Sequence, residues 1–381
     1  MKILIAGDLV TQNRIRDIIT GDHYHDLLSE VRPYTESSDY SILNFETTME
    51  DPSRRFRPIP KVGPHISSPA NTLEMIKEAG FQCVTLANNH ILDYGGDALL
   101  HTVRAIEEKG LDHVGAGKDL EEASKVLVKR IGEADFAIVN FCEDDFSIAG
   151  EHDPGACPMD LVKILRQLRW AKDHADHVIV IAHGGIELYP LPSPRMKELY
   201  RTFVDLGADA VVNHHQHCHS GYEVYNGKPI IYGLGNLLFD RKKYSDPLWN
   251  YGYMVRLDIG EDVGFEAIPY SQCLDRLAVS VLHGAEREKF MEGLASLNRQ
   301  IADDAELQTQ YERLVSRKYR QVLMRLSPFS GKFLASLAQK GWIKIAPREK
   351  KALGMMEYLT CDAHRDLARN VLSRYIGNDK K

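Results

Sequence analysis

Four of the chain's sixteen histidines lie within six positions, at His214, His215, His217 and His219, directly after the short apolar run 210–212. This run predicts a buried strand that ends in imidazole side chains. Side chains two positions apart on a strand point to the same side, so we expect His215 and His217 to reach one metal ion or two adjacent ions. Histidines clustered by chance on a surface are the alternative, but these lie between two strand-like runs. The pattern therefore favours a metal site.

Polar side chains also mark the ends of four other apolar runs, where open α/β sheets bind their ligands. They are Asp8 after 2–7, Asn44 and Glu46 at the end of 40–45, Asn88, Asn89 and His90 after 81–87, and His183 after 177–182. Mixed oxygen and nitrogen ligands from separate strands can hold two cations about 3.5–4 Å apart around a shared hydroxide. The sequence therefore predicts a two-metal hydrolase site.

Several of these residues have a second interpretation. Asp8 alone could cap a following helix, and Asn88 could close an Asx turn. An amide beside His90 would supply a neutral ligand next to a proton donor. The residues expected to meet the substrate are Asn44, Asn88, Glu187, which follows two glycines, and Asn236, which follows a glycine-rich bend.

The segment 51–69 is rich in Pro, Arg and Ser and has no hydrophobic period, which predicts a loop over the site. Its Arg54, Arg55, Arg57 and Lys61 could meet an anionic substrate. Charges that are simply solvated on a loop are the commoner explanation.

The composition is that of a globular protein, with 381 residues, 44% hydrophobic residues and a formal net charge of −7. The acidic balance argues against a nucleic-acid partner. Six cysteines without a CxxC pair predict a reducing compartment. The first apolar run is too short for a signal peptide or a membrane span, so we expect a cytoplasmic protein.

The last third is expected to be helical, at 286–301, 307–326, 332–339 and 351–375. Between 313 and 351 there are eleven Lys or Arg and one acid, interleaved with aromatic residues. This composition would suit contact with an anionic polymer or with the membrane surface, which would make the protein peripheral to the membrane. The solvated face of docked helices is the favoured explanation, because such helices are common.

In this order the motifs resemble those of the CapA family, the poly-γ-glutamate capsule synthesis proteins, within the calcineurin-like metallophosphoesterase superfamily. The motifs are GDLV at 7–10, NFE at 44–46, LANNHILDYG at 86–95, HGGIE at 183–187, and HHQH and GNLLFD between 214 and 240. The resemblance implies an α/β fold, a four-layer α/β/β/α sandwich of the metallophosphoesterase type. We expect this domain to span 1–270 and a helical C-terminal extension to span 271–381.

The resemblance also implies a set of site residues and one or two divalent cations, for which Mn, Fe and Zn are equally suitable. The implied metal ligands are Asp8, Glu46, Asn89, His183, His215 and His217, and the catalytic residues are His90, as general acid, and Asp93. Three positions depart from the family pattern. Val10 replaces the histidine of a DxH motif, Glu46 replaces a bridging Asp, and Asn213 and Gln216 replace Gly and Pro.

Two functions follow from this resemblance. The first is a hydrolase that uses a metal-activated hydroxide on a phosphoryl or acyl centre, in the synthesis or processing of a capsule or other anionic, poly-γ-glutamate-like cell-surface polymer. Its substrate would be that polymer or a phosphoester. The second is a non-catalytic, metal-containing binding subunit of a capsule-synthesis complex. A phosphodiesterase of nucleotides is less favoured, because the sequence shows no phosphate-binding glycine loop.

Overall fold

The structure is a computed structural model that describes residues 1–51, 53, 55–241, 246–325 and 349–360, with the single positions 337, 342, 364, 368 and 372. Its contacts divide the chain into two units, Met1–Gln308 and Thr309–Lys381. Each unit is described by itself below.

The first sheet has eight strands in the order β18-β17-β16-β1-β2-β5-β6, with β15 also paired to β1. Its central strand β1 is buried on both faces, which explains why it reads as a continuous apolar run. The strands of this sheet are β1 (Lys2–Val10), β2 (Tyr40–Phe45), β5 (Cys83–Thr85), β6 (Asp112–Val114), β15 (Asn236–Phe239), β16 (Tyr251–Ile259), β17 (Val263–Gln272) and β18 (Val279–Val281). Because β1, β2 and β5 are parallel, their carboxyl ends meet at one edge.

The second sheet has six strands in the order β13-β14-β12-β11-β9-β8. Its strands are β8 (Leu127–Ile131), β9 (Ala134–Cys142), β11 (His177–His183), β12 (Ala210–His214), β13 (Tyr222–Tyr225) and β14 (Lys228–Ile231). β9, β11 and β12 are parallel, with His183 paired to His214 in register. β8 and β9 form an antiparallel pair.

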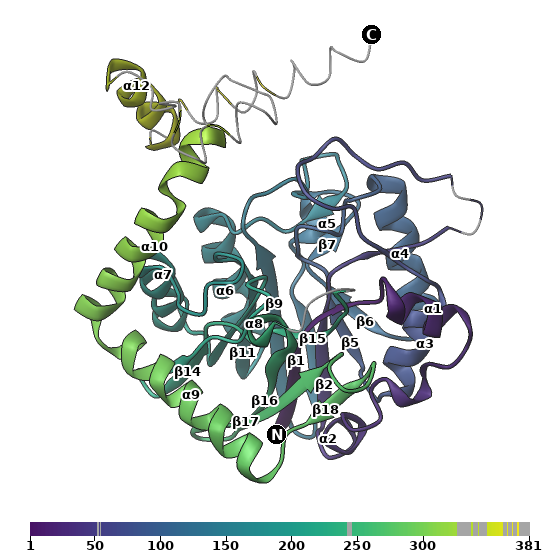
Figure 1. The fold of residues 1–381 in the computed structure, drawn as a ribbon. Helices are drawn as coiled ribbons and strands as arrows, with labels where there is room; N and C mark the ends of the chain where they lie inside the picture. Colours follow the sequence, from purple (N-terminus) through teal and green to yellow (C-terminus); the bar gives the residue numbers. More distant parts are fainter. Residues whose placement is uncertain are drawn as a thin grey trace. The chain divides into compact units, whose positions relative to one another are not determined.

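The two sheets pack face to face over one hydrophobic core. Ile3, Ile5 and Ile42 from the first sheet share this core with Ile179 and Val212 from the second. Helices cover the outer faces: α3 (Asn71–Glu78) and α4 (Gly96–Glu108) lie on the side of the first sheet, and α6 (Leu161–His174) and α7 (Pro194–Asp205) pack on the second (Figure 1). The predicted α/β class and four-layer α/β/β/α sandwich are therefore confirmed.

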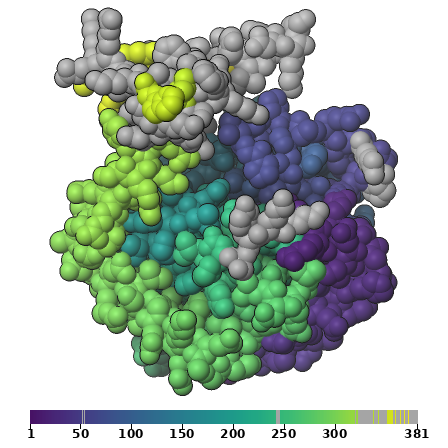
Figure 2. Space-filling model, viewed as in Figure 1, coloured from purple at the N-terminus to yellow at the C-terminus, as the bar shows by residue number. Residues whose placement is uncertain are grey.

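Segments far apart in the sequence meet around the first sheet. The purple N-terminal residues and the green residues that follow residue 250 lie side by side on one face of the space-filling view (Figure 2). Arg276 pairs with Glu30 there, and the backbone amide of Val279 donates to the carbonyl of Leu27. The shorter elements are α1 (Arg14–Thr20), η1 (Tyr24–Asp26), α2 (Arg32–Glu36), β3 (Thr48–Met49), β4 (Ser67–Ser68), β7 (Ala116–Gly117), α5 (Leu120–Ala123), β10 (Gly155–Ala156) and α8 (Pro247–Asn250).

The C-terminal part is helical. α9 (Gly284–Ala302) packs on β13 and β17, while α10 (Asp304–Arg325) and α12 (Glu349–Thr360) follow. The expected helix at 332–339 and most of the basic segment 313–351 lie outside the described residues. The predicted boundary between residues 270 and 271 falls within β17, which pairs with β16 through Ser271, whereas the contacts divide the chain after Gln308. Within the described ranges, no helix has the length and apolar character to cross a membrane.

Candidate metal centre

The carboxyl ends of the parallel strands of both sheets meet at one site. Asp8 lies at a register shift in β1 and Glu46 directly follows β2, and both are fully buried. From the second sheet, His183 ends β11, while His215 and His217 follow β12. The first sheet thus brings carboxylates and the second brings imidazoles to the same place.

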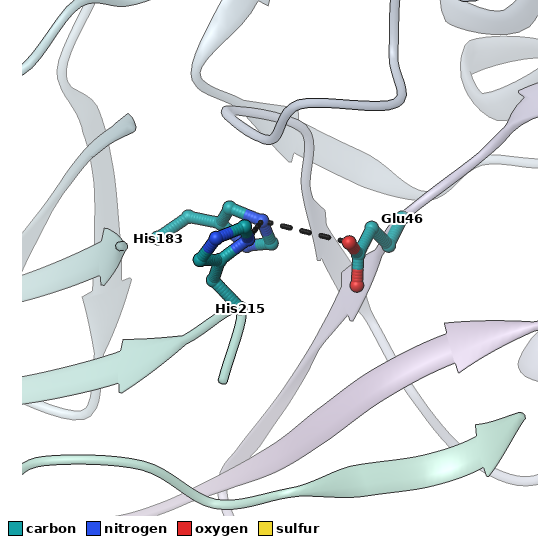
Figure 3. A group of neighbouring side chains, drawn as sticks. All are labelled: Glu46, His183 and His215. Atoms are coloured by element: carbon teal, nitrogen blue, oxygen red, sulfur yellow. Dashed lines mark hydrogen bonds and ion pairs between the residues drawn. The ribbon is translucent and has the colours of Figure 1, made fainter. Parts of the chain in front are cut away.

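These five side chains form two groups with the spacing of metal ligands, and Glu46 belongs to both. One group is Glu46, His183 and His215, and the other is Asp8, Glu46 and His217, with the ligand atoms of each group within 4.8 Å of one another. Nε2 of His183 lies 3.6 Å from Oε1 of Glu46, and Nε2 of His217 lies 3.7 Å from the same oxygen. Figure 3 shows His183 and His215 facing Glu46 from the opposite side of the site.

The state of Glu46 tests whether these residues suit a cation. Neither carboxylate oxygen of Glu46 has a hydrogen-bond partner among the described residues, although both are buried. A buried carboxylate is costly without donors or a cation. Burial raises the pKa of Glu46 well above its usual value, the charge of His217 opposes this, and the charge of Asp8 adds to it. A divalent cation would satisfy both oxygens, and the mixed O and N donors suit Mn, Fe or Zn.

The pKa values of the other ligands reflect how closely they interact. Burial alone would raise the pKa of Asp8, but hydrogen bonds to His214 and His217 hold it well below its usual value. Burial alone would lower the pKa of His217, but the negative charges of Glu46 and Asp8 raise it to about 9. For His215, burial and the nearby charge of His217 lower the pKa to about 4.

Asparagine side chains hold the ligands in place. Nδ2 of Asn44 donates to Oδ1 of Asp8 at 2.8 Å, and Oδ1 of Asn236 lies 2.9 Å from Nδ1 of His217. Such partners fix the orientation of a metal ligand. Oδ1 of Asn89, a predicted ligand itself, lies 3.0 Å from Nε2 of His183, so the structure places it beside the first group.

The four residues predicted to meet a substrate differ in exposure. Asn44, Asn88 and Asn236 are buried and bond within the protein, with Nδ2 of Asn88 donating to the carbonyl of Phe45 at 2.9 Å. Asn88 also accepts from the backbone amide of His90, as expected for an Asx turn. Glu187 is exposed in the turn after β11. The substrate contacts of all four stay predictions.

The histidine-rich turn departs from the predicted strand geometry. β12 ends at His214, and the backbone of His215 and His217 has φ values of 90° and 53°. Non-glycine residues rarely adopt this region, and they cluster there at functional sites. The two ring centroids lie 6.1 Å apart, but strand alternation is not what brings them together. The turned backbone instead directs His215 to one ligand group and His217 to the other.

His90 and Asp93 form a pair at the edge of the centre. Nδ1 of His90 lies 2.7 Å from Oδ2 of Asp93, and Nε2 of His90 lies 3.9 Å from Oε1 of Glu46. Burial lowers the pKa of His90, while the bond to Asp93 opposes that effect. The structure therefore brings all the predicted metal and catalytic residues to one region.

Sequence reasoning missed two residues of this region. His214 was grouped with the other histidines but given no role, yet its Nδ1 lies 3.2 Å from Oδ1 of Asp8. Lys61 was interpreted mainly as a solvated loop charge, yet its side chain is 3% exposed and pairs with Asp93. The position of His214 at the very end of the apolar run was a signal for the first. No local signal distinguishes Lys61 from the arginines near it.

The departures from the family pattern have structural explanations. Val10 packs with Ile66, Phe239 and Trp249, so an apolar contact replaces an imidazole there. Nδ2 of Asn213 donates to the carbonyls of Gly184 and Tyr232.

A cavity of about 850 Å³ lies elsewhere, beside α5 and α6. It shares no residue with either ligand group. The chemistry of the ligands, and not this cavity, therefore locates the centre.

The fold and site define a class: an α/β/β/α sandwich with a candidate two-cation centre between its sheets. Residues 2–241 match the family model described as bacterial capsule synthesis protein PGA_cap, and the chain belongs to this family. It is 33% identical over 250 residues to the capsule biosynthesis protein CapA of Bacillus anthracis, covering 63% of this chain and 60% of that protein. It is 30% identical over 239 residues to the PGA biosynthesis protein CapA of Bacillus subtilis (strain 168), covering 62% of each. The matches thus span about six-tenths of these relatives.

Solved structures show a weaker likeness. A novel phosphatase from Mycoplasma pneumoniae has a TM-score of 0.45 and 17% identity, covering 76% of this chain and 96% of that one. The 5'-nucleotidase from Candida albicans SC5314 has a TM-score of 0.40 and 9% identity, covering 83% of this chain and 58% of that one. Likeness at this level carries no argument about activity.

Proposed function

We propose that this protein is a metal-dependent hydrolase that acts in the synthesis or processing of a capsule or other anionic cell-surface polymer, such as one resembling poly-γ-glutamate. Membership of the capsule synthesis family supports the process. The single observation that supports the chemistry is Glu46, a buried carboxylate without hydrogen-bond donors among the described residues, shared by two groups of histidine and carboxylate ligands.

The proposed ligands are divided between two cations. His183 and His215 would hold one, Asp8 and His217 the other, and Glu46 would contribute to both, with Asn89 beside the first. Cations bound in this way supply a nucleophile from water at neutral pH and neutralise charge that develops on a phosphoryl or acyl centre. Asn44 and Asn236 hold Asp8 and His217 in position for this role.

His90 is the proposed proton donor to the leaving group. Its Nε2 faces the centre, 3.9 Å from Oε1 of Glu46, and its Nδ1 is held by Asp93. A carboxylate on Nδ1 fixes the ring and stabilises the protonated form, as in other histidine–carboxylate pairs. Proton transfer therefore takes place at Nε2, on the side of the ring that faces the ligands.

The test compares metal content with turnover. Protein purified without chelators is analysed for Mn, Fe and Zn, then assayed with phosphate monoesters, phosphate diesters and γ-glutamyl amides. His90→Ala should lower turnover by about 10²–10⁴-fold and keep the metal. His174→Ala, at an exposed position on α6, is the matched control and should keep both. Full turnover in His90→Ala would remove His90 from the mechanism.

A second candidate is a non-catalytic, metal-containing subunit of a capsule-synthesis complex. The observation that favours it is Val10, which places an apolar cluster where a further imidazole ligand would lie. In this case the ligand groups would serve structure or docking, and the basic segment 313–351 would contact partners or the membrane surface. Bound metal without turnover of any tested ester or amide would favour this function.

A further inference from the structure

The loop segment 59–66, which lies next to His90, contains a lysine in an unexpected environment. The side chain of Lys61 is 3% exposed, whereas its neighbour Val62 is 77% exposed. An irregular surface loop ordinarily turns its apolar side chains inward and its lysines outward. Burying an ammonium group is costly unless it is paired, so this reversed arrangement requires a specific partner.

That partner is Asp93, which also forms hydrogen bonds with other residues of the segment 59–66. Oδ1 of Asp93 pairs with Nζ of Lys61, and Oδ2 accepts from the backbone amide of Ile66 at 2.7 Å. The backbone carbonyl of Asp93 accepts from the amide of Ile59 at 2.9 Å. The ends and the middle of the segment 59–66 are therefore all tied to one buried residue.

The same carboxylate also orients His90. Oδ2 of Asp93 lies 2.7 Å from Nδ1 of His90, and Nζ of Lys61 lies 3.2 Å from that nitrogen. An ionised carboxylate can only accept hydrogen bonds and an ammonium group can only donate them, so the ion pair with Oδ1 directs Lys61 to Asp93 and leaves Oδ2 to accept from Nδ1–H of the neutral imidazole. Nε2 is then left to face Glu46. The pairing of Lys61 with Oδ1 fixes which oxygen of Asp93 meets the histidine.

We propose that Lys61 is a positioning residue of the centre: through its ion pair with Asp93 it fixes the Nδ1–H tautomer and the ring orientation of His90. The inference rests on the proposed function only in giving His90 a proton-transfer role. Lys61 acts through Asp93 and does not itself contact the substrate. Arg57, on the same segment, is exposed and has no ion pair among the described residues, so it serves as the matched control.

The experiment observes the protonation of the two ring nitrogens of His90 by NMR. Full-length zinc-loaded protein is labelled with ¹⁵N-histidine, and the His90 signals are identified by their loss in His90→Gln. In the wild type and in Arg57→Met, the two ring nitrogens should give one protonated and one unprotonated signal, with the proton on Nδ1. In Lys61→Met these signals should collapse toward an average of two tautomers. Lys61→Arg should restore the wild-type pattern, and zinc content should be equal in all variants.

Kinetics distinguish positioning from substrate binding. If an ester is turned over, Lys61→Met should lower kcat at least tenfold with little change in KM. An unchanged His90 spectrum in Lys61→Met would overturn the proposal, and a rise in KM alone would assign Lys61 to substrate binding instead. Lys61→Gln, which keeps a polar group, serves if Lys61→Met does not fold.

The spectrum needs no turnover, so the two proposals can fail separately. Absence of turnover in the wild type, together with a His90 spectrum that responds to Lys61→Met, would contradict the hydrolase function and support the role of Lys61.

Discussion

The two sheets make unequal contributions to the centre. The eight-stranded sheet supplies oxygen ligands, Asp8 and Glu46, and the six-stranded sheet supplies imidazoles from His183 and from the turn after β12. Neither sheet holds a complete ligand group, because each group needs Glu46 and at least one histidine. The centre therefore exists only when the sandwich is assembled. Metal binding should stabilise the packing of one sheet on the other.

Substitution of Glu46 should have the largest effect on metal binding, because both ligand groups contain this residue. Glu46→Gln removes the one charged oxygen donor that both groups share, so we expect loss of both cations. The affinity should fall by more than the roughly 10–100-fold typical of losing a residue that only supports a ligand. Elemental analysis after dialysis measures this, and Glu151→Gln, at an exposed position, is the control. Retention of two equivalents would show that Glu46 is not a ligand.

Single histidines should separate the two groups. His183→Gln should cost the cation of the first group and His217→Gln the cation of the second, since each histidine belongs to one group only. Each variant should therefore retain about half the metal of the wild type. Cobalt substitution followed by visible absorption would show two different residual sites. Identical residual spectra, or loss of all metal in both variants, would contradict independent groups.

The asparagine side chains that support the ligands test whether the two ligand groups can be weakened separately. Oδ1 of Asn236 lies 2.9 Å from Nδ1 of His217, and among the described residues Asn236 has no hydrogen bond with His183. Asn236→Ala should weaken only the second group, by roughly 10–100-fold. Competition with a fluorescent chelator measures both affinities in one titration. An equal loss at both groups would indicate a general disturbance of the fold.

The smallest expected effect is the pH dependence of binding. The charges of Glu46 and Asp8 raise the pKa of His217 to about 9, so His217 holds a proton near neutral pH before a cation binds. Binding must displace this proton. Affinity should therefore rise with pH, by about tenfold per pH unit for one proton released, and level off above about 9. Calorimetry in two buffers of different ionisation enthalpy counts the protons, and zero protons released would contradict the assignment.

Much of the fold followed from local patterns. Continuous apolar runs predicted β1, β2, β11 and β12. The long hairpin of β16 and β17 was not predicted. In it, polar and charged residues such as Arg256, Asp258 and Glu266 interrupt the apolar pattern. Its pairing with β1 is non-local, so no short window of sequence indicates it.

The sequence by itself determined which chemical groups reach the centre, because a buried strand must end where its apolar run ends and the next polar residue then lies at the sheet edge. Only the tertiary structure decided how those groups are shared. It assigned His215 and His217 to different groups through left-handed backbone, placed Glu46 in both, and turned Lys61 inward to Asp93. These arrangements depend on distances between two sheets and a crossing loop. Such distances are set by packing over the whole core and not by the period of any one strand.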